Sequence, residues 1–314
     1  MNPVDGRWPV AATRDRGRAL LRERVEDFRV VEILEPGAEG DAGHVWMRVR
    51  KTSLSTPAAA RRIADVLLIN PADIGYSGLK DERSISEQWF SVPTPAFSAA
   101  ALQSIEGLSL LEHAMQARKL RRGVHQGNRF EILLREVERP HVPSDPFTFP
   151  NYFGQRRFGY DNIEQARDWL QIRRRRRITP FKRGIYLSVL RSLLFNEVLG
   201  RRVACGNWSE LLDGDVADAG GLPTGPLWGR GTSRTLGLAK EHEDQSLAGY
   251  ADVREGLEFA GVDQDRRSLV GTASAVSVIE VEPGQLMISF FLPVGTYATV
   301  ALDEYFKHCD FATS

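Results

Sequence analysis

Two strand-rich segments flank a helical block, and this order restricts the fold more than any other feature of the chain. The first segment ends near residue 159 and the second begins near residue 271. Between them, apolar residues recur at helical spacing, as from Leu187 to Leu199. Because 314 residues exceed the usual size of one domain, we predict two. A discontinuous domain of residues 1–159 and 271–314 is interrupted by an inserted domain of residues 160–270.

The strand-rich segments predict a mainly antiparallel sheet with helices, an α+β fold. β-branched and aromatic residues dominate Phe28–Leu34 and His44–Lys51, and the turn-forming cluster EPGAEGDAG between them predicts a hairpin. Pro283-Gly284 predicts a second hairpin, before QLMISFFLP. Ser55 and Thr56 are placed to cap a helix that follows them.

Composition and motifs exclude several classes of protein. Hydrophobic residues make up 42% and charged residues 26%, which is ordinary for a globular chain. No run of about 18 apolar residues and no apolar signal core occur, so we expect a cytoplasmic protein. Phosphate-loop, H-E-x-x-H and C-x-x-C motifs do not occur, and Cys205 and Cys309 form no metal-ligand pattern. We therefore expect neither a metal nor a cofactor.

The cations point to a polyanionic partner, although 41 basic and 41 acidic residues cancel. Of the basic residues, 35 are Arg, the side chain that binds phosphate through two parallel hydrogen bonds. A GC-rich genome would give the same bias, but position favours binding. Cations crowd the segment Arg118–Arg129, and Arg173–Arg177 is an unbroken run. One basic face is typical of a nucleic-acid binder, and a solvated helix face is the alternative for the five-Arg run.

One acid stands out in the segment GLKDERS, where Asp81 follows a glycine and Lys80 just before a predicted strand. Its local sequence alone is equally consistent with a solvated turn residue. The wider sequence favours a catalytic role, because the chain resembles the tRNA pseudouridine synthase D (TruD) family. Five segments match in the same order: EDFRVVE, GYSGLKDERSISEQW, GNRFEILLREV, PNYFGQRRFG and FFLPVGTYAT.

The resemblance implies a fold and a reaction. The fold is a pseudouridine synthase fold, a mixed but largely antiparallel sheet with helices, interrupted by an inserted α/β TRUD domain. The reaction is isomerisation of a tRNA uridine to pseudouridine, with position 13 of the D arm expected and with Asp81 as the catalytic acid residue. We expect tRNA as the partner, no membrane, no small-molecule cofactor and a monomer.

The reaction needs few groups. It breaks the N-glycosidic bond and rejoins the base through carbon, without net redox change or hydrolysis, so one ionised carboxylate can suffice. Asp81 would attack the sugar C1′ or abstract a C2′ proton. A carboxylate in a pocket needs a cation to stay ionised. By the resemblance that cation is Arg22, where the family usually carries Lys.

The remaining site residues also come from the resemblance. Asn128 and Phe130 match the family's pocket for the extruded base, as an amide for the uracil edge and an aromatic face. Tyr297, Phe28 and Lys80 are further expected substrate-binding residues, and Lys80 with Arg83 could bind phosphates beside the acid. In a basic cleft between the two domains, eight residues are predicted to bind RNA phosphates: Arg118, Lys119, Arg121, Arg122, Arg156, Arg157, Arg183 and Arg191.

Two other functions stay open on the sequence. The first is a non-catalytic RNA-binding or RNA-chaperone module on the same fold. The second is a glycosidase-type hydrolase that uses Asp81 with Glu82 or Glu87, and that would release uracil where isomerisation leaves the RNA mass unchanged.

Overall fold

A computed structural model describes most of the chain, and within it two compact units can be distinguished. The described residues are 8–13, 15–37, 43–138, 143–159, 161–171 and 178–310, without the side chains of residues 156 and 308–310. The sheet unit comprises Arg16–Phe147, Ala273–Gly295 and Phe306–Ser314, and the helical unit comprises Met1–Asp15, Thr148–Thr272 and Thr296–Tyr305. These units are defined by packing alone, so the predicted domain limits at residues 159 and 271 stay a prediction.

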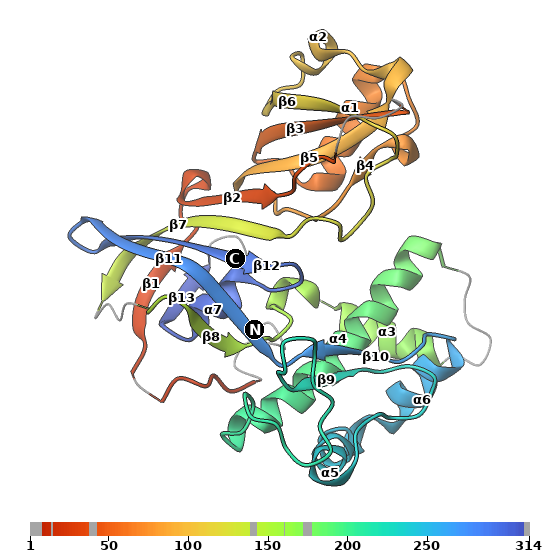
Figure 1. Cartoon of the computed structure of the whole chain (residues 1–314), viewed down its shortest axis with the longest axis vertical. Helices are drawn as coiled ribbons and strands as arrows, with labels where there is room; N and C mark the ends of the chain where they lie inside the picture. Colours follow the sequence, from red (N-terminus) through yellow and green to blue (C-terminus); the bar gives the residue numbers. More distant parts are fainter. Residues whose placement is uncertain are drawn as a thin grey trace. The chain divides into compact units, whose positions relative to one another are not determined.

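A mixed sheet forms the sheet unit (Figure 1). Its neighbouring strands, in spatial order, are β6 (Leu108–Gln116), β3 (His44–Thr52), β5 (Ile85–Pro93), β2 (Phe28–Ile33), β7 (Gly127–Glu138), β12 (Gln285–Pro293) and β11 (Val270–Glu282). Every adjacent pair in this series is antiparallel except β2 with β5. β1 (Gly17–Leu21) pairs with β7 and with β13 (Phe306–Asp310), and the short β4 (Gly75–Tyr76) pairs with β5. The predicted α+β class is confirmed.

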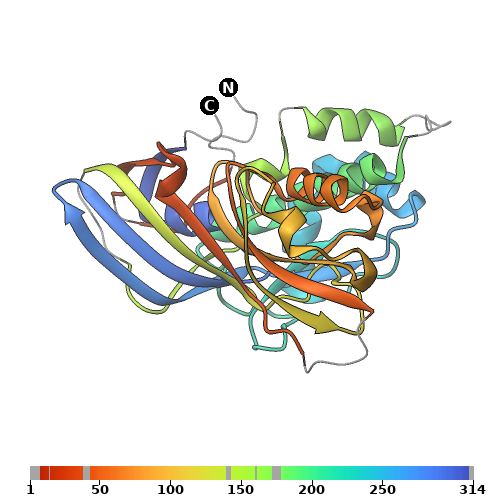
Figure 2. The same ribbon diagram turned by 90° about the horizontal axis from the view of Figure 1, so that it is seen from above.

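Of the two predicted hairpins, one is confirmed and one is wrong. β11 and β12 form a long hairpin beside β7 (Figure 2), and Gly284 at its turn has a left-handed φ of 78°. β2 and β3 do not pair, because β5 lies between them. β5 is buried along most of its length, so it needs a partner on each edge. The long connection between β2 and β3 leaves room for it.

Helix α1 (Thr56–Leu67) covers one face of β3 and β5 and buries the apolar positions that recur along it. Its Ile63 and Ala64 belong to the same core cluster as Met47 and Phe90. Ser55 is the N-cap residue, but its side chain makes no capping hydrogen bond. The Thr56 hydroxyl bonds instead to β5, as described below. A short helix, α2 (Ala99–Leu102), completes the helices of this unit within the described residues.

The helical unit is built around α4 (Pro180–Ala204). Leu190, Leu194 and Val198 of α4 share one core cluster with residues of α3 (Asn162–Gln171) and α6 (Ala251–Phe259). The other elements are α5 (Gly237–Ser246), α7 (Ala298–Asp303), the edge segment β8 (Phe147–Pro150), and the antiparallel pair β9 (Thr224–Leu227) and β10 (Asp265–Ser268). Of the helices in the described part of the chain, none is both long and apolar enough to span a membrane.

Candidate active site

Arg22 and Asp81 meet in the sheet unit, although 59 positions separate them in the sequence. Arg22 directly follows β1, and Asp81 lies in the loop between β4 and β5. The Arg22 Nη1 atom is 2.9 Å from Asp81 Oδ2. The Arg22 side chain is 1% exposed, whereas that of Asp81 is 41% exposed. The site therefore has a buried cation that fixes a carboxylate within reach of solvent.

The loop of residues 77–81, which we call the Asp81 loop, is held by side chains from other elements. The Thr56 hydroxyl accepts from the Lys80 backbone N–H (2.8 Å) and donates to Gln88 Oε1 (2.8 Å). Gln88 Nε2 in turn donates to the Gly78 carbonyl (2.7 Å). After the loop, the Ser84 hydroxyl donates to the Asp81 carbonyl (2.9 Å). Because these groups are mutually satisfied, the backbone that carries Asp81 is positioned in advance.

The start of the Asp81 loop is held in the same way. The Ser77 hydroxyl oxygen accepts from the backbone N–H groups of Val124 and His125, each at 3.0 Å. The Ser77 Oγ atom also lies 2.6 Å from His125 Nδ1. This histidine is buried, and burial lowers its pKa, with Lys80 adding to the effect and Glu32 opposing it.

Lys80 does not extend into solvent beside the acid, as the sequence led us to expect. Its Nζ atom is 2.6 Å from Glu32 Oε2, and the two side chains are 4% and 0% exposed. A Cβ at Gly78 would lie 2.7 Å from this Nζ atom and 2.9 Å from Glu32 Oε2, so a glycine is needed there. With its ammonium group committed to Glu32, Lys80 holds the loop and has no free charge for a phosphate. That expectation is corrected.

A second buried lysine lies close to the same loop. The Lys51 side chain is fully buried in β3, and its ammonium group donates to the Leu54 carbonyl (2.5 Å). Burial lowers the pKa of Lys51 to about 8, and the positive charge of Lys80 adds to this effect, while Asp81, Glu82 and Glu32 oppose it. The loop thus has two interior cations near its backbone.

The predicted base-binding residues share one face of the sheet. Phe130 of β7 lies opposite Val30 of β2, and Asn128 lies opposite Glu32. The rings of Phe130 and Phe28 meet edge to face, with centroids 5.9 Å apart, and the Arg22 guanidinium lies 4.4 Å from the Phe28 ring centroid. Asn128 is half-buried, and its Oδ1 atom is buried without a hydrogen-bond partner among the described residues. A buried acceptor without such a partner is unusual.

The remaining predicted residues are spread over both units. Arg118, Arg121 and Arg122 are exposed in the sheet unit, where Arg122 lies 4.2 Å from the Tyr76 ring centroid. Lys119 is half-buried and bonds to the Ala72 carbonyl, while Arg83 donates to the Glu23 carbonyl (2.7 Å).

In the helical unit, Tyr297 precedes α7, with its ring centroid 6.2 Å from that of Phe153. Arg183 is exposed and donates to the Ala260 carbonyl (2.7 Å). Arg191 differs from the expectation of a free phosphate ligand. It is half-buried, and its Nη2 atom donates to the carbonyls of Leu227 and Asp263. The Arg156 side chain and the run Arg173–Arg177 lie outside the described residues.

Several residues of the site were missed by reasoning from the sequence. Glu32, Thr56 and Gln88 position the Asp81 loop, and only Thr56 had been singled out, as a helix cap. A signal was present in β5 and the residue before it, where Ser84, Ser86 and Gln88 alternate with Ile85 and Glu87 and are all buried. Polar residues at the buried positions of a strand indicate a polar network.

No group of three or more His, Cys, Asp or Glu within the described ranges is arranged to hold a metal ion.

Comparisons with known proteins identify the family of the chain. A family model described as tRNA pseudouridine synthase D (TruD) matches residues 10–165. The tRNA pseudouridine synthase D of Chromohalobacter salexigens is 35% identical over 96% of this chain and 97% of its own. That of Methylococcus capsulatus is 38% identical, over 91% and 90%.

A solved structure from Methanosarcina mazei, titled as a putative tRNA pseudouridine synthase D (TruD), superposes with a TM-score of 0.65 at 19% identity, over 95% of each chain, which shows that the fold is shared. The sequence relatives go further than the fold, because they exceed 30% identity over nearly the whole length. The chain belongs to the tRNA pseudouridine synthase D family, a family of isomerases.

Proposed function

We propose that this pseudouridine synthase isomerises a uridine of the tRNA D arm, at position 13, with Asp81 as its catalytic carboxylate. The observation that carries the proposal is the asymmetric pair of a buried Arg22 and a solvent-reaching Asp81, joined at 2.9 Å. A carboxylate held this way stays ionised and accessible, as a nucleophile or base must be.

The geometry suits the first chemical step by either route. Asp81 Oδ1 can attack C1′ as the bond to N1 breaks, or it can remove the C2′ proton as uracil departs. In the first route C5 of the detached uracil then bonds to C1′ and displaces Asp81, whereas in the second C5 bonds to C1′ as the proton on Asp81 returns to C2′. In both routes C5 finally loses its own proton. Arg22 stabilises the carboxylate throughout, while the hydrogen bonds on the Asp81 loop limit movement of its backbone. Fixed geometry of this kind lowers the entropic part of the barrier.

The orphaned carbonyl of Asn128 supports uracil over cytosine as the reacting base. Uracil carries an N–H at N3, which can donate to Asn128 Oδ1, whereas cytosine has no hydrogen there. The Phe130 and Phe28 rings lie on the same face of the sheet and are 8% and 4% exposed, so each would contact a base that has left its stack through a small part of the ring. We assign these residues to uracil recognition.

Pseudouridine mapping in tRNA made in cells that lack the endogenous protein tests this proposal. Asp81→Asn keeps the shape of the side chain and should abolish modification. Glu82→Gln removes the neighbouring exposed acid and should leave modification intact. A modified D arm with Asp81→Asn would refute the catalytic role and favour a different active residue. Modification at another position only would refute the target, and free uracil in the reaction would favour hydrolysis.

A further inference from the structure

Two arginines lie against one aromatic ring in the helical unit. The guanidinium carbon of Arg267, in β10, is 4.2 Å from the Phe153 ring centroid, and that of Arg157 is 5.7 Å from it. Tyr297 meets the same ring edge to face. Arg157 is exposed and Arg267 is half-buried, so the pair is open to solvent on one side.

Neither guanidinium binds a carboxylate among the described residues. Arg267 Nη2 donates to Asn151 Oδ1 (2.6 Å) and to the Asn151 carbonyl (3.1 Å). Arg157 donates to the hydroxyls of Ser192 and Ser188. Neutral oxygens thus orient each guanidinium group, and its Nη1 atom donates to no described residue.

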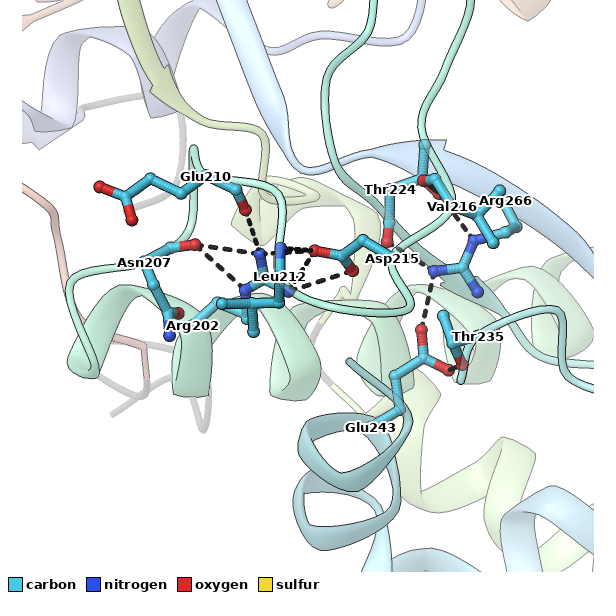
Figure 3. Close-up of polar contacts among 10 residues, drawn as sticks. All are labelled: Arg202, Asn207, Glu210, Leu212, Asp215, Val216, Thr224, Thr235, Glu243 and Arg266. Carbon is cyan, nitrogen blue, oxygen red and sulfur yellow. Dashed lines mark hydrogen bonds and ion pairs between the residues drawn. The ribbon is translucent and has the colours of Figure 1, made fainter. Parts of the chain in front are cut away.

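Two other arginines of this unit are each paired with a carboxylate, as Figure 3 shows. Arg202 pairs with Asp215 at 3.0 Å, and both side chains are buried. Arg266, the residue next to Arg267 in the chain, pairs with Glu243 at 2.7 Å. Arg191 is held by two backbone carbonyls instead. Arg267 differs from all three, because it has no carboxylate partner among the described residues and shares an aromatic ring with a second guanidinium.

Electrostatics favour the binding of an anion at this pair. Burial lowers the pKa of Arg267 to about 10, and the positive charge of Arg157 adds to this effect while Tyr297 opposes it. Two like charges in a setting of neutral oxygens are unfavourable unless an anion binds between them. Two guanidinium forks beside aromatic rings match a phosphate group with an attached sugar or base.

We propose that Arg157 and Arg267 together bind one phosphodiester of the RNA substrate. The inference rests on the proposed function only in taking RNA as the ligand. It adds Arg267, which no sequence argument had singled out, and it makes Arg157 part of a two-arginine site. The asparagine and serine hydrogen bonds orient the two forks before RNA binds.

The test is the salt dependence of tRNA binding, measured with Asp81→Asn protein so that no turnover occurs. Arg267→Gln and Arg157→Gln should each reduce the slope of log Kd against log salt by about 0.7–0.9, because loss of either arginine breaks the one phosphate contact that they share. Between about 50 and 200 mM salt, the affinity advantage of the parent over each variant should shrink about threefold. Binding does not depend on which residue catalyses, so failure of this inference is distinguishable from failure of the Asp81 proposal.

Arg230→Gln is the matched control, because Arg230 in the same unit is already neutralised by Asp263 at 2.9 Å. It should leave the slope unchanged. Arg157 is exposed and its loss should not unfold the protein, so Arg157→Gln decides the question if Arg267→Gln is unstable. An unchanged slope for Arg157→Gln overturns the proposal. If inorganic phosphate raises the Tm of the parent but not of the variants while slopes stay equal, the site takes free phosphate, and the RNA assignment is overturned.

Discussion

Lys51 is a fully buried side chain whose ammonium group has one hydrogen-bond acceptor among the described residues, the Leu54 carbonyl. Replacing it by methionine keeps the length of the side chain and removes the charge. Because burial lowers the pKa of Lys51, its protonated form is less stable in the folded chain than in the unfolded chain. We therefore expect Lys51→Met to stabilise the protein near neutral pH.

The size of the effect follows from the pKa difference. A change from 10.5 to about 8 corresponds to about 3 kcal/mol at pH 7, where the charge is present in both states. Between these two pKa values the unfolded chain binds more protons, so the stability of the parent rises with pH across this window. At pH 10 the cost falls to about 1 kcal/mol. The lost hydrogen bond to Leu54 costs about 1 kcal/mol at every pH.

Urea unfolding of parent and Lys51→Met at pH 7 and pH 10 measures the effect. The variant should be the more stable protein at pH 7 by about 2 kcal/mol, and the two should be nearly equal at pH 10. The double difference removes every group that titrates alike in both proteins. If the stability difference between the two proteins is the same at both pH values, Lys51 is not a buried ammonium with a lowered pKa, and the reasoning fails.

Two further predictions concern the Asp81 site. Arg22→Met should lower kcat about tenfold, because it removes a charge-assisted hydrogen bond whose contribution is reduced by the partial exposure of Asp81. Arg22→Lys keeps the charge and should retain most activity. Single-turnover kinetics would measure the difference between the two variants. Thr56→Val removes the partner of the Lys80 N–H and of Gln88 Oε1, so it should lower the free energy of unfolding by about 1–3 kcal/mol and reduce kcat more than tRNA affinity. Thr56→Ser is its control, and equal behaviour of Val and Ser would show that the hydroxyl is not needed.

Elements with local signals could be predicted from the sequence. The β11–β12 hairpin has its turn residues, Pro283 and Gly284, between two apolar runs, and α1 shows its helical spacing within twelve residues. The β2–β3 hairpin was wrong because strand pairing is a long-range choice. β5 begins 52 residues after the end of β2, and the sequence near the turn cluster contains no signal that β5 lies between β2 and β3.

The candidate site likewise contains residues that could be predicted from the sequence and residues that could not. The family resemblance named Arg22 and Asp81, and the structure places them 2.9 Å apart. Local reading failed for Lys80, which stands at a loop between polar residues and looks solvated. Its partner Glu32 lies 48 positions earlier, on an inward-facing position of β2, and a buried ion pair over that distance leaves no local pattern. That Arg267 pairs with no carboxylate of the described residues is likewise visible only in three dimensions.

The attachment of the Asp81 loop has a consequence for folding. Its partners come from β2, α1 and β5 and from the residues before β7, so the loop takes its final shape only after segments far apart in sequence have assembled. Bringing segments so far apart in sequence together reduces chain entropy before stabilising contacts can form, so this step is slow. During refolding, isomerase activity should therefore recover with the last native contacts of the sheet unit, later than the helical signal. Grafted onto another protein, the seven residues GLKDERS would be an ordinary charged turn.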